Sequence, residues 1–181
     1  GVDFLLTSSQ KCLALPPGLA LAAATDRALA KAESVTNRGW YFDLLLMEKH
    51  RIKDSTPMTP AMALIFALDK QLDRILAEGL DARFARHAAM SKKVQDWASE
   101  RGMEPLAKPG FRSKTVVTVN NSLKWDISAL NKFLEEHGMR ISNGYGELKN
   151  KTFRIAHMGE LTMTDVKEVI AAIEKILPTL G

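Results

Sequence analysis

Two apolar runs open the chain, and a polar segment separates them. Residues 2–7 (VDFLLT) and 18–24 (GLALAAA) contain almost no charged side chain. Runs of this length and composition predict strands buried on both faces, as in a parallel sheet covered by helices. The segment between them carries Lys11, and Pro16 and Pro17 stiffen its exit. The sequence therefore predicts a lysine on a loop between two buried strands.

The next part of the chain has the spacing of amphipathic helices. Thr25 or Asp26 caps an expected helix to about residue 35, and residues 40–51 form an apolar stretch with a basic end. The clearest helix is expected between Thr59 as N-cap, with Pro60 as its first residue, and Gly79 as its stop. Its apolar stripe consists of Ala63, Leu64, Ala67, Leu68, Leu72, Ile75 and Leu76.

After residue 80 the pattern becomes that of an α+β domain. The predicted elements are helices at 81–101, 126–137 and 162–177 and strands at 115–120, 139–142 and 153–158. The helix at 81–101 is expected to turn inward Phe84, Ala88, Val94, Trp97 and Ala98. Thr162 and Asp165 are spaced as a capping box at the start of the last helix. We predict a change of domain near residues 78–80.

Composition narrows the class of protein. The chain has 181 residues, of which 46% are hydrophobic and 25% charged, as in ordinary globular proteins. No run of about 18 apolar residues predicts a membrane span. The net charge of +4 is scattered along the chain, which disfavours nucleic-acid binding. Cys12 is the single cysteine, so a reducing compartment, by default the cytoplasm, is expected.

The N-terminus is unusual for a complete domain. No methionine precedes Gly1, and a strand-like run begins at the second residue without a cap. We therefore expect the sequence to be the C-terminal part of a longer polypeptide.

Lys11 is the first candidate for chemistry. Most lysines lie on the surface and carry no function. A lysine beside buried strands, however, loses hydration, which lowers the pKa of the amine and frees it to form Schiff bases with carbonyl compounds. Cys12, its neighbour, is expected to be a small buried apolar residue more often than a reactive thiol.

Two further segments could bind anions. Ser55, Thr56 and Thr59 precede the clearest helix, and hydroxyls with free backbone N–H groups at a helix N-terminus bind phosphate. The simpler interpretation is that Thr59 only caps that helix. Arg154 lies within an apolar strand, where its planar fork suits either a substrate carboxylate or a structural Asp or Glu. The glycines around Tyr145 indicate a flexible loop beside it.

The histidines do not predict a metal site. His50, His87 and His137 fall at helix ends or on helix faces, and none has metal-ligand spacing with a nearby cysteine or carboxylate cluster. No metal is expected.

Four stretches together resemble class V aminotransferases, which are fold-type-I enzymes that use pyridoxal 5'-phosphate. They are SQK after VDFLL, the following CLALPPGLA, STPMTPA before a helix, and GYGELKNKTFRIAHMGELT before the last helix. Their order and spacing are most like the alanine–glyoxylate and serine–glyoxylate branch. The resemblance implies an α/β fold, with residues 1–78 ending a large cofactor-binding domain and residues 79–181 forming a small C-terminal α+β domain.

The resemblance also implies residue roles. Lys11 would form the Schiff base with the cofactor and shuttle the proton, and Gln10 would contact the cofactor phosphate. Thr56, with Ser55 and Thr59 as less secure matches, would reach the phosphate of the neighbouring subunit in a homodimer. Arg154 would hold the α-carboxylate of a small amino acid, such as alanine or serine, whose amino group passes to a keto acid such as glyoxylate or pyruvate.

Some parts of the family site are expected upstream of this chain. They are a glycine-containing cofactor loop, an aromatic that stacks on the pyridine ring, and an aspartate for the pyridine nitrogen; Asp3 is too close to Lys11 to be that aspartate. The isolated chain is therefore expected to be inactive. Two alternatives stay open: a class V lyase or desulfurase, which needs a cysteine on a mobile loop, and a non-catalytic dimerisation module.

Overall fold

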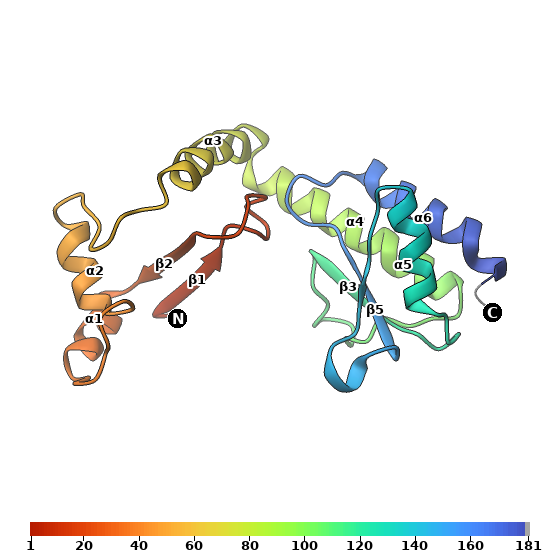
Figure 1. The fold of residues 1–181 in the computed structure, drawn as a ribbon, viewed down its shortest axis with the longest axis horizontal. Helices are drawn as coiled ribbons and strands as arrows, with labels where there is room; N and C mark the ends of the chain where they lie inside the picture. Colours follow the sequence, from red (N-terminus) through yellow and green to blue (C-terminus); the bar gives the residue numbers. More distant parts are fainter. Residues whose placement is uncertain (180–181) are drawn as a thin grey trace. The chain divides into compact units, whose positions relative to one another are not determined.

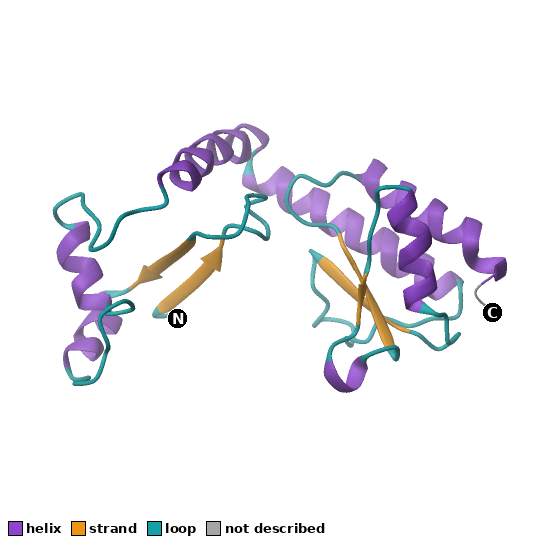
Figure 2. Ribbon diagram, in the orientation of Figure 1, coloured by secondary structure: helices purple, strands orange, loops and turns teal. Residues whose placement is uncertain are grey.

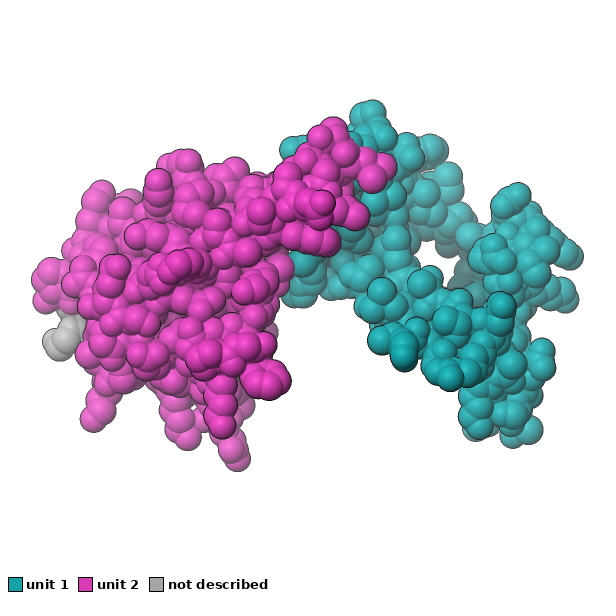
Figure 3. Space-filling view, turned by 180° about the vertical axis from the view of Figure 1, so that it is seen from behind, with its two compact units in different colours: residues 1–74 teal, residues 75–181 magenta. Residues whose placement is uncertain are grey.

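A computed structural model describes residues 1–179, which form two compact units, residues 1–74 and residues 75–179, coloured separately in Figure 3. The elements of the first unit are β1 (Phe4–Ser8), β2 (Ala20–Ala24), α1 (Asp26–Glu33), α2 (Leu44–Arg51) and most of α3 (Met62–Glu78). Those of the second are α4 (Leu80–Glu100), β3 (Val116–Asn120), α5 (Ile127–Glu136), β4 (Ser142–Asn143), η1 (Gly146–Leu148), β5 (Thr152–Ala156), α6 (Met163–Ile176) and η2 (Leu177–Thr179).

The first two strands form a hairpin (Figure 1), which corrects the expectation of parallel, fully buried strands. β1 pairs with β2 in antiparallel register, from Phe4 opposite Ala24 to Ser8 opposite Ala20. Most of their side chains are exposed; Leu5 and Leu6 keep 65% and 62% of their accessible surface. The two runs have the composition of buried strands, but no described helix packs on both faces of the hairpin. Composition predicted the strands correctly but could not predict their direction.

The helices of the first unit start later than expected in two cases. Thr25 caps α1 as predicted, accepting a hydrogen bond from the Ala28 N–H. α2 begins only at Leu44, because the Asp43 carboxylate accepts from the Leu45 N–H and caps it there. α3 begins at Met62, so Thr59 is not its N-cap and Pro60 is not its first residue. Its expected apolar stripe is only partly covered, since Leu72 and Leu76 are exposed.

The second unit is built on an antiparallel sheet in the order β3-β5-β4 (Figure 2). The register places Val117 opposite Ile155 and Val119 opposite Phe153, and all four side chains are buried. Since successive side chains of a strand point to opposite faces, Arg154 of β5 lies on the other face of the sheet. β4 is limited to two residues, so the strand expected at 139–142 is shorter and lies further along the chain.

Three helices cover the buried face of this sheet. α6 packs against both α4 and α5, and α4 packs against β3 (Figure 1). Asp126 caps α5 through two backbone N–H groups, and the Thr162–Asp165 capping box starts α6, as the sequence predicts. Trp97, Trp125 and Phe153 form an aromatic cluster at the centre of the core, with Trp125 stacked on Phe153 at 5.7 Å between ring centroids.

The inward face of α4 differs from the prediction in its first turns. Phe84 is 63% exposed, whereas Arg83 and His87 are buried. Further along, Val94, Trp97 and Ala98 are buried as expected. The inward face of α4 therefore carries polar side chains in its first turns. Burial of Arg83 is tolerated there because its guanidinium donates hydrogen bonds to carboxylates.

The two compact units divide inside α3, between Arg74 and Ile75. The predicted domain boundary lies four residues further on, where Gly79 has a positive φ of 81° between α3 and α4. This left-handed conformation suits glycine, and it separates the two helices. No helix among residues 1–179 is long and apolar enough to cross a membrane.

Candidate functional site

The loop that carries Lys11 is held together by Ser9. The Ser9 hydroxyl donates to the Pro16 carbonyl at 2.7 Å and accepts from the Leu19 N–H at 3.3 Å. The Ser9 backbone N–H donates to the Leu19 carbonyl, also across the loop. Ser9 is fully buried, so these bonds are shielded from water. The sequence does not reveal this role of Ser9, because its partners are seven and ten residues away.

Lys11 lies at the tip of the β1–β2 connection. The Ala14 N–H donates to the Lys11 carbonyl at 2.9 Å and closes a turn there. Gln10, Lys11 and Cys12 are all exposed. The expectation that buried strands dehydrate the Lys11 amine is therefore wrong for the described chain, as is the expectation of a buried Cys12, because the flanking strands are themselves exposed.

The three hydroxyl residues before α3 are exposed and lie in an irregular segment. Ser55 contacts the imidazole Nδ1 of His50 at 3.0 Å, and Thr56 donates to the Met58 carbonyl at 2.6 Å. Thr59 lies three residues before the first residue of α3. The predicted anion site directly at the helix N-terminus is therefore not formed by Thr59. The three hydroxyls instead lie in the irregular segment that leads to the helix.

Arg154 lies on the outer face of the sheet, at its β4 edge. Nε and Nη2 of its guanidinium both donate to the Asn143 carbonyl, at 3.3 and 3.2 Å. Its Cζ lies over the Tyr145 ring, 4.1 Å from the ring centroid, which is a cation–π contact. Within residues 1–179, no carboxylate forms an ion pair with Arg154. Residues 1–179 therefore do not supply the Asp or Glu that the alternative of a structural pair requires.

The loop beside Arg154 is closed by two asparagines. The Asn143 amide donates to the Asn150 side-chain oxygen at 2.7 Å, and the Asn150 backbone N–H donates back to Asn143 Oδ1 at 2.8 Å. At Gly144 a Cβ atom would lie 2.1 Å from the Leu148 carbonyl oxygen, so only glycine fits. The glycines predicted a flexible loop, but hydrogen bonds and close packing hold this one in place.

A hollow of about 520 Å³ opens beside Arg154. It is formed by α5, the β4 segment and the start of the asparagine-closed loop. Its charged lining residues are Lys132, Glu135, Arg140 and Arg154. Glu135 pairs with Arg140 at 3.5 Å between Oε1 and Nε, which leaves Lys132 and Arg154 as cations without an ion pair among the described residues. The hollow is therefore suited to an anion.

A partly buried ionic cluster fixes the turn that follows β5. Arg83 and Arg86 of α4 both donate to the Glu78 carboxylate, and Nη2 of each donates to the Gly159 carbonyl, at 3.1 and 3.2 Å. Hydrogen bonds from Arg86, and secondarily from Arg83, lower the pKa of Glu78 to about 2. The cluster ties the connection between β5 and α6 to the start of α4.

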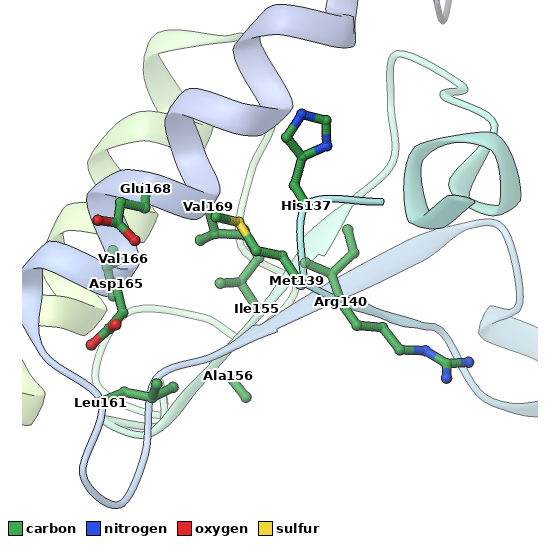
Figure 4. A pocket seen from close by; sticks show the side chains of 12 residues that line it. His137, Met139, Arg140, Ile155, Ala156, Leu161, Asp165, Val166, Glu168 and Val169 are labelled. Atoms are coloured by element: carbon green, nitrogen blue, oxygen red, sulfur yellow. The ribbon is translucent and has the colours of Figure 1, made fainter. Parts of the chain in front are cut away.

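A second hollow, of about 360 Å³, lies between the end of α5 and the start of α6 (Figure 4). Its charged lining residues include Arg140, Asp165 and Glu168, and Figure 4 shows the Arg140 guanidinium directed away from both carboxylates. Asp165 already closes the capping box with Thr162. None of the predicted site residues lines this hollow.

Among residues 1–179, no group of three or more His, Cys, Asp or Glu side chains is placed to bind a metal ion. His157, which the sequence did not single out, is fully buried, and its ring nitrogens have no hydrogen-bond partner among residues 1–179. Burial, with a smaller contribution from His87, lowers the pKa of His157, which favours its neutral form.

Comparison with known proteins gives a consistent result. No protein-family model matches the chain. An uncharacterized aminotransferase of Methanocaldococcus jannaschii is 34% identical over 99% of this chain and 48% of its own length. The L-aspartate–glyoxylate aminotransferase of Paracoccus denitrificans is 33% identical over the whole chain and 46% of its own length.

Solved structures agree with the sequence matches. The alanine–glyoxylate aminotransferase of a Nostoc species has a TM-score of 0.88 and 28% identity, and it covers 98% of this chain and 48% of its own. The pyridoxamine–pyruvate aminotransferase of Mesorhizobium loti has a TM-score of 0.89 and 29% identity, over 99% and 47%. The chain spans about half the length of the curated relatives it matches. In sequence and in fold it corresponds to the C-terminal half of the class V aminotransferases, with the alanine–glyoxylate and serine–glyoxylate enzymes among its relatives.

Proposed function

We propose that this chain supplies half of the site of a pyridoxal phosphate-dependent aminotransferase. The proposed reaction moves an amino group from a small amino acid, alanine or serine, to a 2-keto acid such as glyoxylate or pyruvate. The observation that carries the proposal is Arg154, an arginine that faces an open hollow without a carboxylate partner among residues 1–179. The names of the relatives support the same class of reaction.

The donor groups of the chain fit the cofactor. A primary amine, Lys11, is available to condense with an aldehyde, and its loop is braced by the buried Ser9. Gln10 beside it offers a neutral amide to a phosphate oxygen. When bound, pyridoxal phosphate supplies an electron sink for the α-carbon of the amino acid. Lys11 is then the group that accepts the Cα proton and returns it to the cofactor side.

The exposed hydroxyl segment is assigned to phosphate binding. Thr56 is the first choice, with Ser55 and Thr59 beside it, and all three hydroxyls are accessible. In the proposed homodimer this segment reaches the phosphate held by the neighbouring subunit. The Thr56 hydroxyl now donates to Met58, so phosphate binding would exchange that bond for one to a phosphate oxygen.

Arg154 is assigned to the substrate carboxylate. Its planar fork holds a carboxylate in one orientation, and this fixes the direction of the Cα–H bond that breaks. The charge of Lys132 in the same hollow also favours an anionic substrate. The single cysteine is consistent with a cytoplasmic location, which we include in the proposal.

The lyase or desulfurase alternative is less well supported. It needs a nucleophilic cysteine that reaches the substrate on a mobile loop. Cys12, the only cysteine of the chain, lies in the turn next to Lys11. Because Cys12 is adjacent to the proposed Schiff-base lysine, its position is fixed by the same turn, and it is not on a separate mobile loop. We therefore keep aminotransfer as the proposed reaction.

A transfer assay separates the two reactions. The polypeptide, expressed as its gene encodes it, is supplied with pyridoxal phosphate, alanine and glyoxylate, and glycine and pyruvate are measured. We expect equal amounts of both products, because transamination gives one keto acid for each amino acid formed. Release of pyruvate without glycine would support the lyase alternative.

A further inference from the structure

The Tyr145 ring restricts the orientation of Arg154. The guanidinium is planar, and all its N–H bonds lie in that plane. The Arg154 Cζ lies over the Tyr145 ring, 4.1 Å from the ring centroid, so the ring occupies the space on one side of the guanidinium. Tyr145 itself is 76% exposed, so the contact lies at the surface. Stacking of this kind favours one tilt of the guanidinium over the others that a long side chain can adopt.

The Asn143 carbonyl determines which edge of the guanidinium is available. It accepts from Nε and Nη2, which are the two nitrogens of one edge. The other edge, formed by Nη1 and the second N–H of Nη2, has no hydrogen-bond partner among residues 1–179. A carboxylate that binds through two parallel N–H···O bonds therefore fits the Nη1–Nη2 edge.

The loop holds Tyr145 where this contact requires it. Tyr145 follows Gly144, whose N–H donates to the Thr152 carbonyl at 3.0 Å and to Asn143 Oδ1 at 2.7 Å. The reciprocal Asn143–Asn150 bonds close the loop behind it. The ring is thus presented by a fixed backbone, which reduces the entropy lost when it stacks.

We propose that Tyr145 is a positioning residue: with the Asn143 carbonyl it fixes the Arg154 guanidinium so that its Nη1–Nη2 edge receives the substrate carboxylate. This inference rests on the proposed function, in which Arg154 binds that carboxylate. Tyr145 acts through Arg154 and need not touch the reacting atoms. The contact with Arg154 is made by the π-face of the ring, not by its hydroxyl, so phenylalanine can replace Tyr145.

The test measures both the arginine and the carboxylate in the 181-residue chain. The Arg154 ¹Hε–¹⁵Nε resonance is assigned by NMR from its absence in the Arg154→Lys variant and is followed during titration with pyruvate. The backbone amide signals of residues 143–145 are followed in the same titrations, so that binding is also measured in Arg154→Lys. Pyruvamide, which lacks the carboxylate, serves as the neutral control. The same titration is run on Tyr145→Phe and Tyr145→Ala. Tyr41→Ala is the matched control, because Tyr41 is the other tyrosine of the chain and is also exposed.

We expect three results. Pyruvate, but not pyruvamide, shifts the Arg154 signal of the unchanged chain. Tyr145→Ala weakens pyruvate binding about two- to fivefold, as expected for an exposed cation–π contact, and removes the ring-current shift of the Arg154 Hε signal. Tyr145→Phe and Tyr41→Ala leave both the affinity and the shift unchanged.

Two contrary results are distinguishable. An unchanged pyruvate affinity in Tyr145→Ala, while Arg154→Lys still abolishes or weakens binding, would overturn the positioning role and leave the proposed function standing. If pyruvate does not shift the Arg154 signal of the unchanged chain, or if Arg154→Lys binds pyruvate as well as the unchanged chain does, then carboxylate binding by Arg154 is overturned as well.

Discussion

Arg154 differs from the other strongly held arginines of the second unit. Arg83, Arg86 and Arg101 each donate to a carboxylate, whereas Arg154 donates only to a backbone carbonyl and stacks on an aromatic ring. A neutral carbonyl leaves most of the guanidinium charge uncompensated. An arginine with an uncompensated charge is suited to bind an anionic ligand.

Replacing Arg154 tests this role at the level of one side chain. In the gene-encoded polypeptide, Arg154→Ala should raise the KM for the amino acid about tenfold or more, because hydrogen bonds to a charged group are lost. Loss of orientation of the Cα–H bond should also lower kcat. Steady-state kinetics with alanine as donor measure both. Arg101→Ala, which removes a partly exposed arginine paired with Glu174, is the control and should leave KM unchanged. An unchanged KM in Arg154→Ala would contradict the assignment.

Some residues of the candidate site can be recognised in the sequence, and others cannot. Lys11 and Arg154 stand out through their motifs, and Arg154 also as a charge within an apolar strand. Ser9 and Asn143 could not be predicted, because their roles depend on partners that only the folded loops bring near. The burial argument for Lys11 failed for a related reason, since the sequence does not say what covers a strand.

At the level of helices and strands, features that depend on neighbouring residues were predicted correctly from the sequence. The starts of α5 and α6 are set by side chains two or three residues away, so the sequence predicted them correctly. The antiparallel direction of β1 and β2 and the inward face of α4 are set by contacts distant in sequence. Arg83 is the clearest case, because its burial depends on Glu160, 77 residues away.

The ionic cluster of Glu78 predicts an acid-sensitive element. The pKa of Glu78 is about 2 in the folded state against an ordinary 4.5, so the unfolded chain binds more protons between these values. The contribution of Glu78 to stability is thus complete above about pH 4.5 and is lost as the pH falls toward 2. Urea unfolding across this range should show a flatter pH dependence for Glu78→Gln than for the unchanged chain.

Other carboxyl groups also titrate in this range, so the comparison needs a control. Glu104→Gln changes an exposed carboxyl outside the cluster and should leave the pH dependence as it is in the unchanged chain. Parallel stability curves for Glu78→Gln and the unchanged chain would show that the cluster does not contribute in this way.

The whole molecule is uneven in its burial of apolar side chains. In residues 1–74 the buried side chains are those of Ser9 and Gln71, whereas the core of the second unit contains aromatic, branched and methionine side chains. Since burial of apolar surface is the main source of stability, the second unit should be the more stable one.

Hydrogen exchange of the 181-residue chain measures this difference. Amides of β3, β5, α4 and α6 should be protected, and those of β1 and β2 should exchange much faster despite their paired backbones. The comparison is made within one sample, so pH and temperature affect both units equally. Similar protection in β1 and β5 would contradict the expectation.

The central claim, that Lys11 is the residue that binds the cofactor covalently, is tested most directly by trapping. The gene-encoded polypeptide is incubated with pyridoxal phosphate and treated with borohydride, which reduces the C=N bond to a stable secondary amine, and its peptides are analysed by mass spectrometry. We expect the phosphopyridoxyl group on Lys11, at one group per chain, and its loss in Lys11→Ala. A label spread over other exposed lysines, or a label that persists in Lys11→Ala, would contradict it.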